Sequence, residues 1–139
     1  MSDNTESTAT GSSLCGAVRY TVHTDLRPEV RPCHCTQCRK QSGHFASYVA
    51  IPDKTGLRIE GEENITWYRA SETAKRGFCK VCGSHLIWAP EGLPGIDVSG
   101  GTLDRHPPLH IDHHIFVADK GDYYEINDPV PQHDTYPED

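Results

Sequence analysis

The sequence lacks both a basic excess and any long apolar run. Its 139 residues carry 13 Lys and Arg against 20 Asp and Glu, which gives a formal net charge of −7. A general nucleic-acid or membrane-surface binder needs a basic face, so this balance argues against both kinds of partner. No apolar stretch approaches the roughly 20 residues that a membrane-spanning helix requires.

The first residues also lack the features of a secretory signal. MSDNTESTATGSS has no basic start and no apolar centre, and its small polar residues predict a disordered tail over residues 1–10. We therefore expect a cytoplasmic protein, and disulfides are rare in that compartment. The six cysteines are accordingly predicted to be metal ligands or reactive thiols.

Helical periodicity is scarce as well. Only TQCRKQSG, residues 36–43, is compatible with a short helical turn, which Gly43 would end. Elsewhere, short segments rich in β-branched and aromatic residues alternate with Gly and Pro, which is typical of an all-β fold in one domain. Strands are expected at 18–22, 47–51, 57–61, 65–70, 85–90, 96–103 and 114–119.

The cysteines fall into groups that suggest metal binding. Cys15 stands alone, PCHCTQCRK contains Cys33, Cys35 and Cys38, and FCKVCGS contains Cys79 and Cys82. A C-x-x-C pair on a tight turn directs two sulfurs at one ion. One interpretation is a single structural zinc-ribbon site made by Cys35, Cys38, Cys79 and Cys82, with Cys15 and Cys33 left as buried thiols. The other is two three-sulfur sites, one of Cys33, Cys35 and Cys38 and one of Cys15, Cys79 and Cys82.

A site with three sulfur ligands could bind a substrate at the metal, which a site with four protein ligands could not. Three protein ligands plus an open position is the form of a catalytic zinc. Such an ion can bind and deprotonate a thiol or polarise a carbonyl group. Three anionic sulfurs weaken its Lewis acidity, so the site favours thiolate exchange over water activation.

Several stretches together resemble a known family. GSSLCGAVRY, PCHCTQCRKQSGHFASYVAI, RGFCKVCGSHLIW, VSGGTLD and HHIFVADKGDYYEINDPVPQ occur in this order. The chain thereby resembles the glutathione-dependent formaldehyde-activating enzymes, whose domain the centromere protein V family shares. The resemblance covers residues 11–132 and leaves 133–139 as a loose acidic tail. It implies a β-tent of antiparallel strands, as in Mss-four-like proteins, built around zinc knuckles.

The resemblance also implies how the cysteines pair. Cys33, Cys35 and Cys38 match the motif that holds the family's catalytic zinc, while Cys15, Cys79 and Cys82 match ligands of its structural zinc. Two zinc ions per chain are therefore expected. Ser13 stands where the family has a further cysteine, and serine is a poor zinc ligand. The second site would keep three sulfurs plus water, recruit a neighbouring side chain, or be occupied in part.

The expected function follows from the resemblance. It is a zinc-dependent carbon–sulfur lyase or synthase acting on adducts of a small thiol, possibly glutathione, with formaldehyde or another aldehyde. The alternative is a non-enzymatic, zinc-stabilised module that binds a protein partner. A third interpretation is a thiol redox or zinc-buffering role, because zinc thiolates release their metal on oxidation.

Three residues near the first cluster could have a role in function or only a structural one. Arg39 and Lys40 are candidates for binding the carboxylates of a glutathione-like substrate, or else they are solvated surface charges. His34 lies between two cysteines and would face solvent, serve as a proton shuttle, or act as a spacer.

A group of histidines and several aromatic residues are not expected to form binding sites of their own. His106, His110, His113 and His114 follow one another closely. Neighbouring residues of an extended segment point to opposite faces, so His113 and His114 are not expected to chelate one ion. Trp67, Tyr68 and Trp88 lie in predicted strands and are interpreted as core or pocket wall rather than as a cofactor platform.

Overall fold

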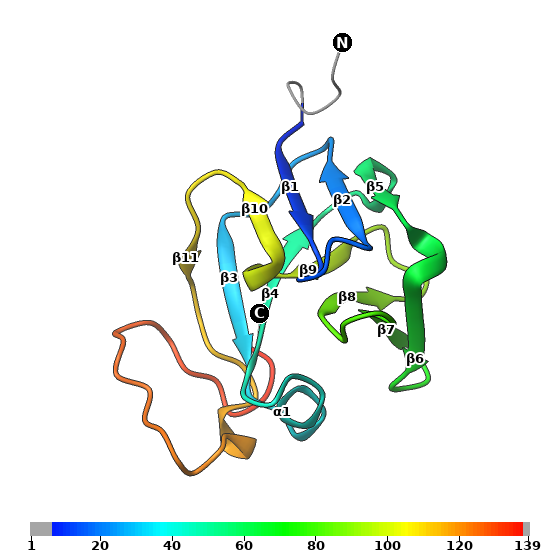
Figure 1. Cartoon of the computed structure of the whole chain (residues 1–139). Helices are drawn as coiled ribbons and strands as arrows, with labels where there is room; N and C mark the ends of the chain where they lie inside the picture. Colours follow the sequence, from blue (N-terminus) through cyan, green and yellow to red (C-terminus); the bar gives the residue numbers. More distant parts are fainter. Residues whose placement is uncertain (1–6, 138–139) are drawn as a thin grey trace.

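Two β-sheets carry most of the secondary structure in the computed structural model, which describes residues 7–137 (Figure 1). The smaller sheet has four antiparallel strands. Their order is β10 (Leu103–Arg105), β1 (Ala9–Ser12), β2 (Arg19–Val22) and β5 (Leu57–Glu60). The predicted all-β class is confirmed.

The larger sheet has seven strands. Their order is β11 (His110–Ile111), β3 (Glu29–Cys33), β4 (Ala46–Ile51), β9 (Ile96–Ser99), β8 (His85–Pro90), β7 (Ala74–Cys79) and β6 (Ile65–Arg69). The pairs are antiparallel except that β11 runs parallel to β3. The long connection from β3 to β11 allows this parallel edge, which corrects the expectation of antiparallel strands alone.

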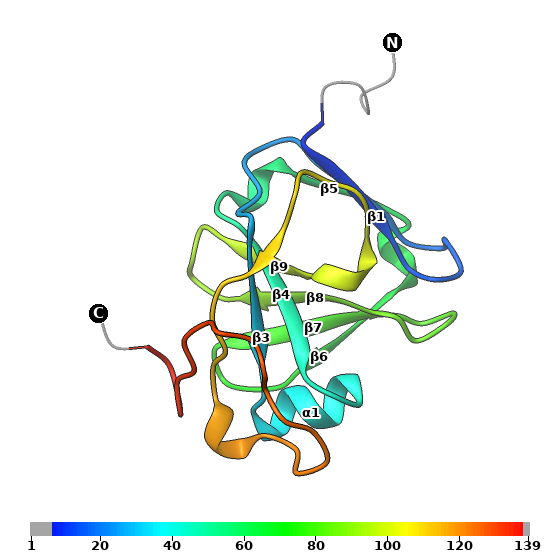
Figure 2. The same ribbon diagram turned by 90° about the vertical axis from the view of Figure 1, so that its left-hand side faces the viewer.

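The main core joins the two sheets. Tyr20 and Val22 of β2 belong to the same buried cluster as Val49 and Ile51 of β4 and Val98 of β9. Figure 2 shows the smaller sheet lying across one end of the larger one. Alternate residues of each strand point inward, so this packing fixes the register of both sheets.

Two smaller apolar clusters contain cysteines. Cys79 packs with Val18, Ile65, Leu86 and Ile87. The other cluster consists of Cys33, Cys38, Ala46, Tyr48 and Ile115. Each group of cysteines is therefore supported by packed side chains rather than by a mobile loop alone.

One short helix, α1 (Thr36–Ser42), follows β3. The sulfur of Cys35 caps its start by accepting a hydrogen bond from the Cys38 N–H. Gly43 ends it with a left-handed backbone, φ 87°, and donates its N–H to the Arg39 carbonyl. A left-handed residue after a helix is commonly glycine because no Cβ clashes there. The predicted helical turn is confirmed.

Some expected elements differ from those observed. The segment 114–119, expected as a strand, forms two isolated bridges and the 3-10 helix η5 (Val117–Asp119) instead. The remaining 3-10 turns are η2 (Lys54–Gly56), η3 (Glu62–Asn64) and η4 (Gly100–Thr102). The predicted strand 96–103 is divided by η4 into β9 and β10, and strands β1, β3, β7 and β11 are additional to those predicted.

Both expected tails are partly ordered where the structure describes them. Strand β1 begins at Ala9, within the segment 1–10, because it pairs with β2 and β10. In the segment 133–139, the carbonyls of Thr135 and His133 accept hydrogen bonds from Phe116 and Val117. Residues 1–6 and 138–139 lie outside the described part of the chain.

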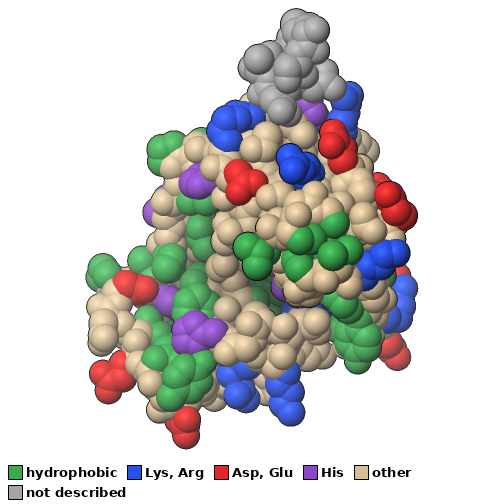
Figure 3. Space-filling view, viewed as in Figure 1, with side chains coloured by type: hydrophobic (Ala, Val, Ile, Leu, Met, Phe, Trp, Pro, Cys, Tyr) green, Lys and Arg blue, Asp and Glu red, His purple; other side chains and the backbone are tan. Residues whose placement is uncertain are grey.

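Surface charge and helix length bear on whether nucleic acids or membranes are partners. Acidic and basic side chains are interspersed across the face shown in Figure 3. Within residues 7–137, no helix has the length and apolar character needed to cross a membrane.

Candidate functional site

The first group of cysteines converges at the junction of β3 and α1. The ligand sulfurs of Cys33, Cys35 and Cys38 lie within 4.8 Å of one another. Cys33 ends β3, Cys35 caps α1, and Cys38 lies in the first turn of that helix. Cys33 and Cys38 are buried, whereas Cys35 is half-buried. The strand-to-helix turn thus brings three sulfurs together from six residues of sequence.

Hydrogen bonds concentrate negative charge on one of these sulfurs. Bonds from the Cys33 and Cys35 thiols, and then from Arg76 and Tyr48, lower the pKa of Cys38 to about 2 against the opposing effect of burial. Bonds to its two neighbouring sulfurs and burial raise the pKa of Cys33. The cluster therefore favours an ionised Cys38, and thiolates are the sulfur ligands that zinc prefers.

All three sulfur-bearing residues line a cavity of about 400 Å³. Its apolar wall includes Trp88, Ile115, Phe116 and Tyr136, and its charged residues are Arg31, Arg76 and Asp119. The expectation of core or pocket wall is confirmed for Trp88, whereas Trp67 and Tyr68 are exposed and lie outside this cavity. A cavity with an apolar wall and a few polar groups is typical of a small-molecule site.

The two arginines of the cavity were missed in the sequence. Arg31 pairs with Asp97 at 2.6 Å, and burial raises the pKa of that carboxyl although Arg31 opposes the shift. Arg76 lies in β7, for which the sequence predicted no strand. A strand with alternating faces over 74–79 would have placed Arg76 on the same side as Ala74, which is also buried.

Phe116 has an unusual backbone at the edge of this cavity. Its φ is 57°, and it is the non-glycine residue with a left-handed backbone in the described chain. Such a conformation costs about 1–2 kcal/mol for a residue with a Cβ. Hydrogen bonds from Phe116 and Val117 to Thr135 and His133 hold it there, and its ring packs on Tyr136 at 5.0 Å.

The second group of cysteines lies where the β1–β2 and β7–β8 turns meet. The sulfurs of Cys15, Cys79 and Cys82 also lie within 4.8 Å of one another. Ser13 is buried, and its hydroxyl is 3.6 Å from the Cys15 sulfur. It also contacts the backbone N–H and carbonyl of Val18 at 3.3 and 3.4 Å. Serine therefore stands beside this cluster, where a fourth sulfur would complete it.

The β7–β8 turn shapes the outer part of this cluster. Gly83 adopts φ 84° and donates its N–H to the Cys79 carbonyl, which closes the C-x-x-C turn. Bonds from the Ser84 hydroxyl and backbone lower the pKa of Cys82 to about 6. The turn thus stabilises the thiolate form of Cys82.

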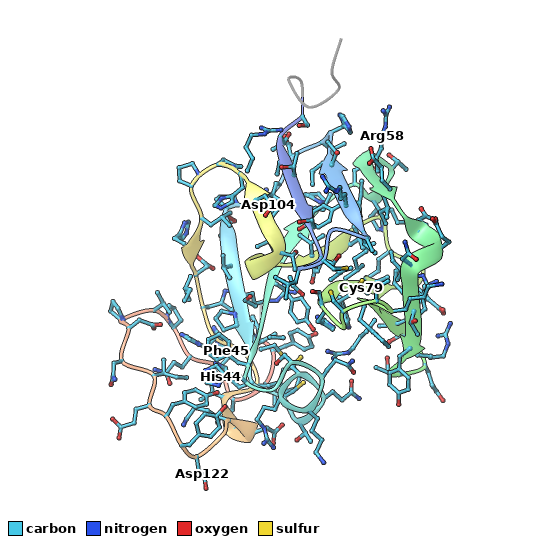
Figure 4. The ribbon with its side chains drawn as sticks, viewed as in Figure 1. His44, Phe45, Arg58, Cys79, Asp104 and Asp122 are labelled. Carbon is cyan, nitrogen blue, oxygen red and sulfur yellow. The ribbon has the colours of Figure 1, made fainter. Side chains whose placement is uncertain are left out.

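The sulfurs of both clusters are close enough to bind one metal ion each, and the spacing in the second cluster fits zinc. The sulfurs of Cys15 and Cys79 are 3.7 Å apart, and tetrahedral zinc with bonds of about 2.3 Å separates its sulfur ligands by about 3.8 Å. The single zinc-ribbon interpretation is wrong, because the pairs Cys35–Cys38 and Cys79–Cys82 belong to different clusters. Figure 4 shows Cys79 well apart from His44 and Phe45, which follow α1.

His34 neither faces solvent nor contacts the cysteine sulfurs through its ring nitrogens. It is fully buried, and its Nδ1 lies 2.5 Å from the Tyr124 hydroxyl. Its Nε2 lies 2.9 Å from Nδ1 of His114, whose Nε2 is 2.8 Å from Asp128. One arrangement of protons satisfies every group. The Tyr124 hydroxyl donates to His34 Nδ1, His34 Nε2–H donates to His114 Nδ1, and His114 Nε2–H donates to the Asp128 carboxylate. This chain ties the segment 114–128 to β3.

The other candidate residues lie away from the cavity lining. Lys40 is exposed and lines a separate hollow with Tyr68, and Arg39 is half-buried near the end of α1. His113 and His114 have different partners: His113 contacts Asp112, whereas His114 joins the buried chain described above.

Comparison with known proteins identifies the family. A model of the glutathione-dependent formaldehyde-activating enzymes matches residues 8–119. The chain belongs to this family.

Individual relatives agree with this assignment. The chain is 28% identical over 126 residues to a protein of Halomonas elongata that is provisionally named a glutathione-dependent formaldehyde-activating enzyme; the match covers 84% of this chain and 79% of that one. It is 26% identical over 117 residues to an uncharacterized lyase of Schizosaccharomyces pombe, covering 84% and 83%. A crystal structure of a Rhodobacter sphaeroides protein is 28% identical, with a TM-score of 0.56 over 88% of this chain and 98% of that chain.

Proposed function

We propose that this protein is a zinc-dependent carbon–sulfur lyase or synthase acting on adducts of a small thiol, such as glutathione, with formaldehyde or another aldehyde. The observation that carries the proposal is the convergence of Cys33, Cys35 and Cys38 in the wall of a cavity. Among residues 7–137, no fourth Cys, His, Asp or Glu joins this group. Three protein ligands beside a cavity match a zinc site that keeps one position for substrate.

The two clusters would hold two zinc ions with different roles. Zinc held by Cys33, Cys35 and Cys38 would supply a place for a thiolate sulfur and polarise an aldehyde oxygen. Zinc held by Cys15, Cys79 and Cys82 would join the β1–β2 turn to the β7–β8 turn and so have a structural role. Membership of the family supports both assignments.

The reaction requires few groups. In synthesis, the thiol loses its proton and its sulfur attacks the aldehyde carbon to form the carbon–sulfur bond. The C=O electron pair moves to oxygen, which takes up a proton; cleavage reverses these steps. Trp88 and Phe116 would exclude water from the cavity. Asp119, which is exposed at the cavity, would accept the ammonium group of an amino-acid-like thiol.

A cytoplasmic location is part of the proposal. All six cysteines are free, and zinc thiolates require reduced cysteines. Reduced cysteines are the norm in that compartment.

Exchange NMR tests the proposed reaction, because it measures adduct formation and cleavage above the uncatalysed rate. Mixtures of glutathione and formaldehyde should exchange faster with the zinc-loaded protein, since bound thiolate and aldehyde meet in a fixed orientation. Cys38→Ser should return the exchange to the uncatalysed rate. A matched replacement in the other cluster, Cys82→Ser, should retain most of the acceleration if the protein stays folded. A zinc-loaded protein that neither binds glutathione nor accelerates exchange would refute the proposal.

A further inference from the structure

Arg76 is a buried cation without a carboxylate partner among the described residues. It lies in the middle of β7 and is 3% exposed. The guanidinium group stays protonated in proteins, and a buried charge is costly unless an opposite charge lies nearby. The ion pairs formed between residues 7 and 137 do not include Arg76. Its negative partner must therefore be sought among other groups.

The contacts of Arg76 lead to the cysteine cluster. One terminal nitrogen donates to the Tyr48 hydroxyl at 3.0 Å. The other lies 3.6 Å from the Cys38 sulfur and 3.5 Å from the Gln37 side-chain oxygen. Because Tyr48 accepts from Arg76, its own proton is free to point at the Cys38 sulfur, also 3.6 Å away. Two donors thus meet at one sulfur.

Arg31 provides a contrast within the same cavity. Its charge is already balanced, because Asp97 lies 2.6 Å away and is itself almost buried. The two cavity arginines therefore differ: one carries its own counter-ion, and the other faces the sulfurs. Three thiolates and a divalent cation sum to one negative charge. Arg76 would bring that total to zero.

We propose that Arg76 is the charge partner of the metal site formed by Cys33, Cys35 and Cys38, and that it positions the Cys38 thiolate for metal binding. Its hydrogen bond draws electron density from the Cys38 sulfur, which leaves the metal able to accept a further anionic sulfur. Without Arg76, a site with a bound thiolate substrate would bury two uncompensated negative charges. The substrate part of this inference rests on the proposed function; the metal-binding part does not.

Zinc affinity tests the role of Arg76 independently of activity. The purified full chain is titrated against a coloured zinc chelator, with zinc alone as the probe. Arg76→Met should weaken the binding of one zinc ion by about 10–100-fold, the usual effect of losing a group that hydrogen-bonds a metal ligand. The second zinc ion should be held as before, which a general loss of fold would not allow. Arg76→Lys should give an intermediate affinity, since it keeps the charge but not the forked donor.

Two further variants make the test decisive. Arg69→Met removes an exposed arginine from the neighbouring strand, where it pairs with Glu91, and should leave both affinities unchanged. Tyr48→Phe removes the other donor to Cys38 and should weaken the same zinc ion several-fold, which decides the matter if Arg76→Met does not fold. Folded Arg76 and Tyr48 variants that hold both zinc ions as tightly as the wild type would overturn the inference. This result would stand even if the protein catalyses the proposed reaction.

Discussion

Ser13 stands beside the second cysteine cluster, at the position where the resemblance to the family predicts a further cysteine. Its hydroxyl is buried beside Cys15, near the position that a fourth sulfur would take. A hydroxyl is a much weaker zinc ligand than a thiolate. The metal of this cluster should therefore exchange more readily than that of a four-sulfur site.

Ser13→Cys should slow the loss of zinc from this cluster. A fourth thiolate completes the tetrahedron, so we expect release of that ion to a chelator to be at least about 10-fold slower. The matched control is Ser12→Cys, because the Ser12 side chain contacts Asp104 instead. Equal release rates for the wild type, Ser12→Cys and Ser13→Cys would show that the residue does not limit metal retention.

His34 gives a prediction about pH. Burial, followed by the electrostatic effects of the neighbouring His114, Lys120 and His44, lowers its pKa to about 4. In the unfolded chain it titrates near 6.5. Between these values the unfolded chain binds a proton that the folded chain does not, so stability is present above pH 6.5 and lost as the pH falls toward 4.

His34→Gln should therefore be less harmful in acid. At pH 7.5 it should lower the free energy of unfolding by about 1–3 kcal/mol, because buried partners lose their hydrogen bonds. The difference from the wild type should shrink between pH 6.5 and 4.5, as measured by urea unfolding of the zinc-loaded proteins. Zinc content is measured alongside, and the comparison uses only pH values at which both proteins hold the same amount of zinc. A difference that stays constant with pH would argue that His34 is already charged when folded.

At the scale of elements, α1 depends on the glycine that ends it. Gly43 has φ 87°, and a Cβ at this position would meet no other atom within 4 Å. Gly43→Ala should thus cost about 1–2 kcal/mol through backbone strain alone. Gly101→Ala is the matched control. A Cβ at Gly101 would also meet no atom within 4 Å, and the backbone there is not left-handed, so we expect the free energy of unfolding to change by no more than about 0.5 kcal/mol. Chemical unfolding measures both, and equal effects would contradict the strain argument.

Two of the strands that the sequence did not predict contain residues that locally disfavour a buried strand. β3 contains Pro32, which suggests a loop, but the edge of the sheet uses only the Pro32 carbonyl, which accepts a hydrogen bond from the Ile115 N–H. Proline is tolerated at such an edge. β7 contains Lys75 and Arg76, whose charges suggest solvent exposure. Tertiary partners of Arg76 override that local preference.

At the scale of the molecule, the cysteine clusters could be predicted and the groups around them could not. Cys33, Cys35 and Cys38 are close in sequence, so one turn brings them together. The partners of His34 are instead supplied by Tyr124 and His114, 90 and 80 residues away. Single-sequence patterns contain no information on such distant contacts. Spacing alone likewise left two pairings of the cysteines open, and only the resemblance to the family favoured Cys15 with Cys79 and Cys82.

A crystal structure of the protein soaked with glutathione, with diffraction data collected at the zinc absorption edge, tests the central claim most directly. We predict an anomalous peak about 2.3 Å from the sulfurs of Cys33, Cys35 and Cys38, with the glutathione sulfur as the fourth ligand. A protein side chain in that fourth position, or the absence of metal from these three sulfurs, would contradict the account.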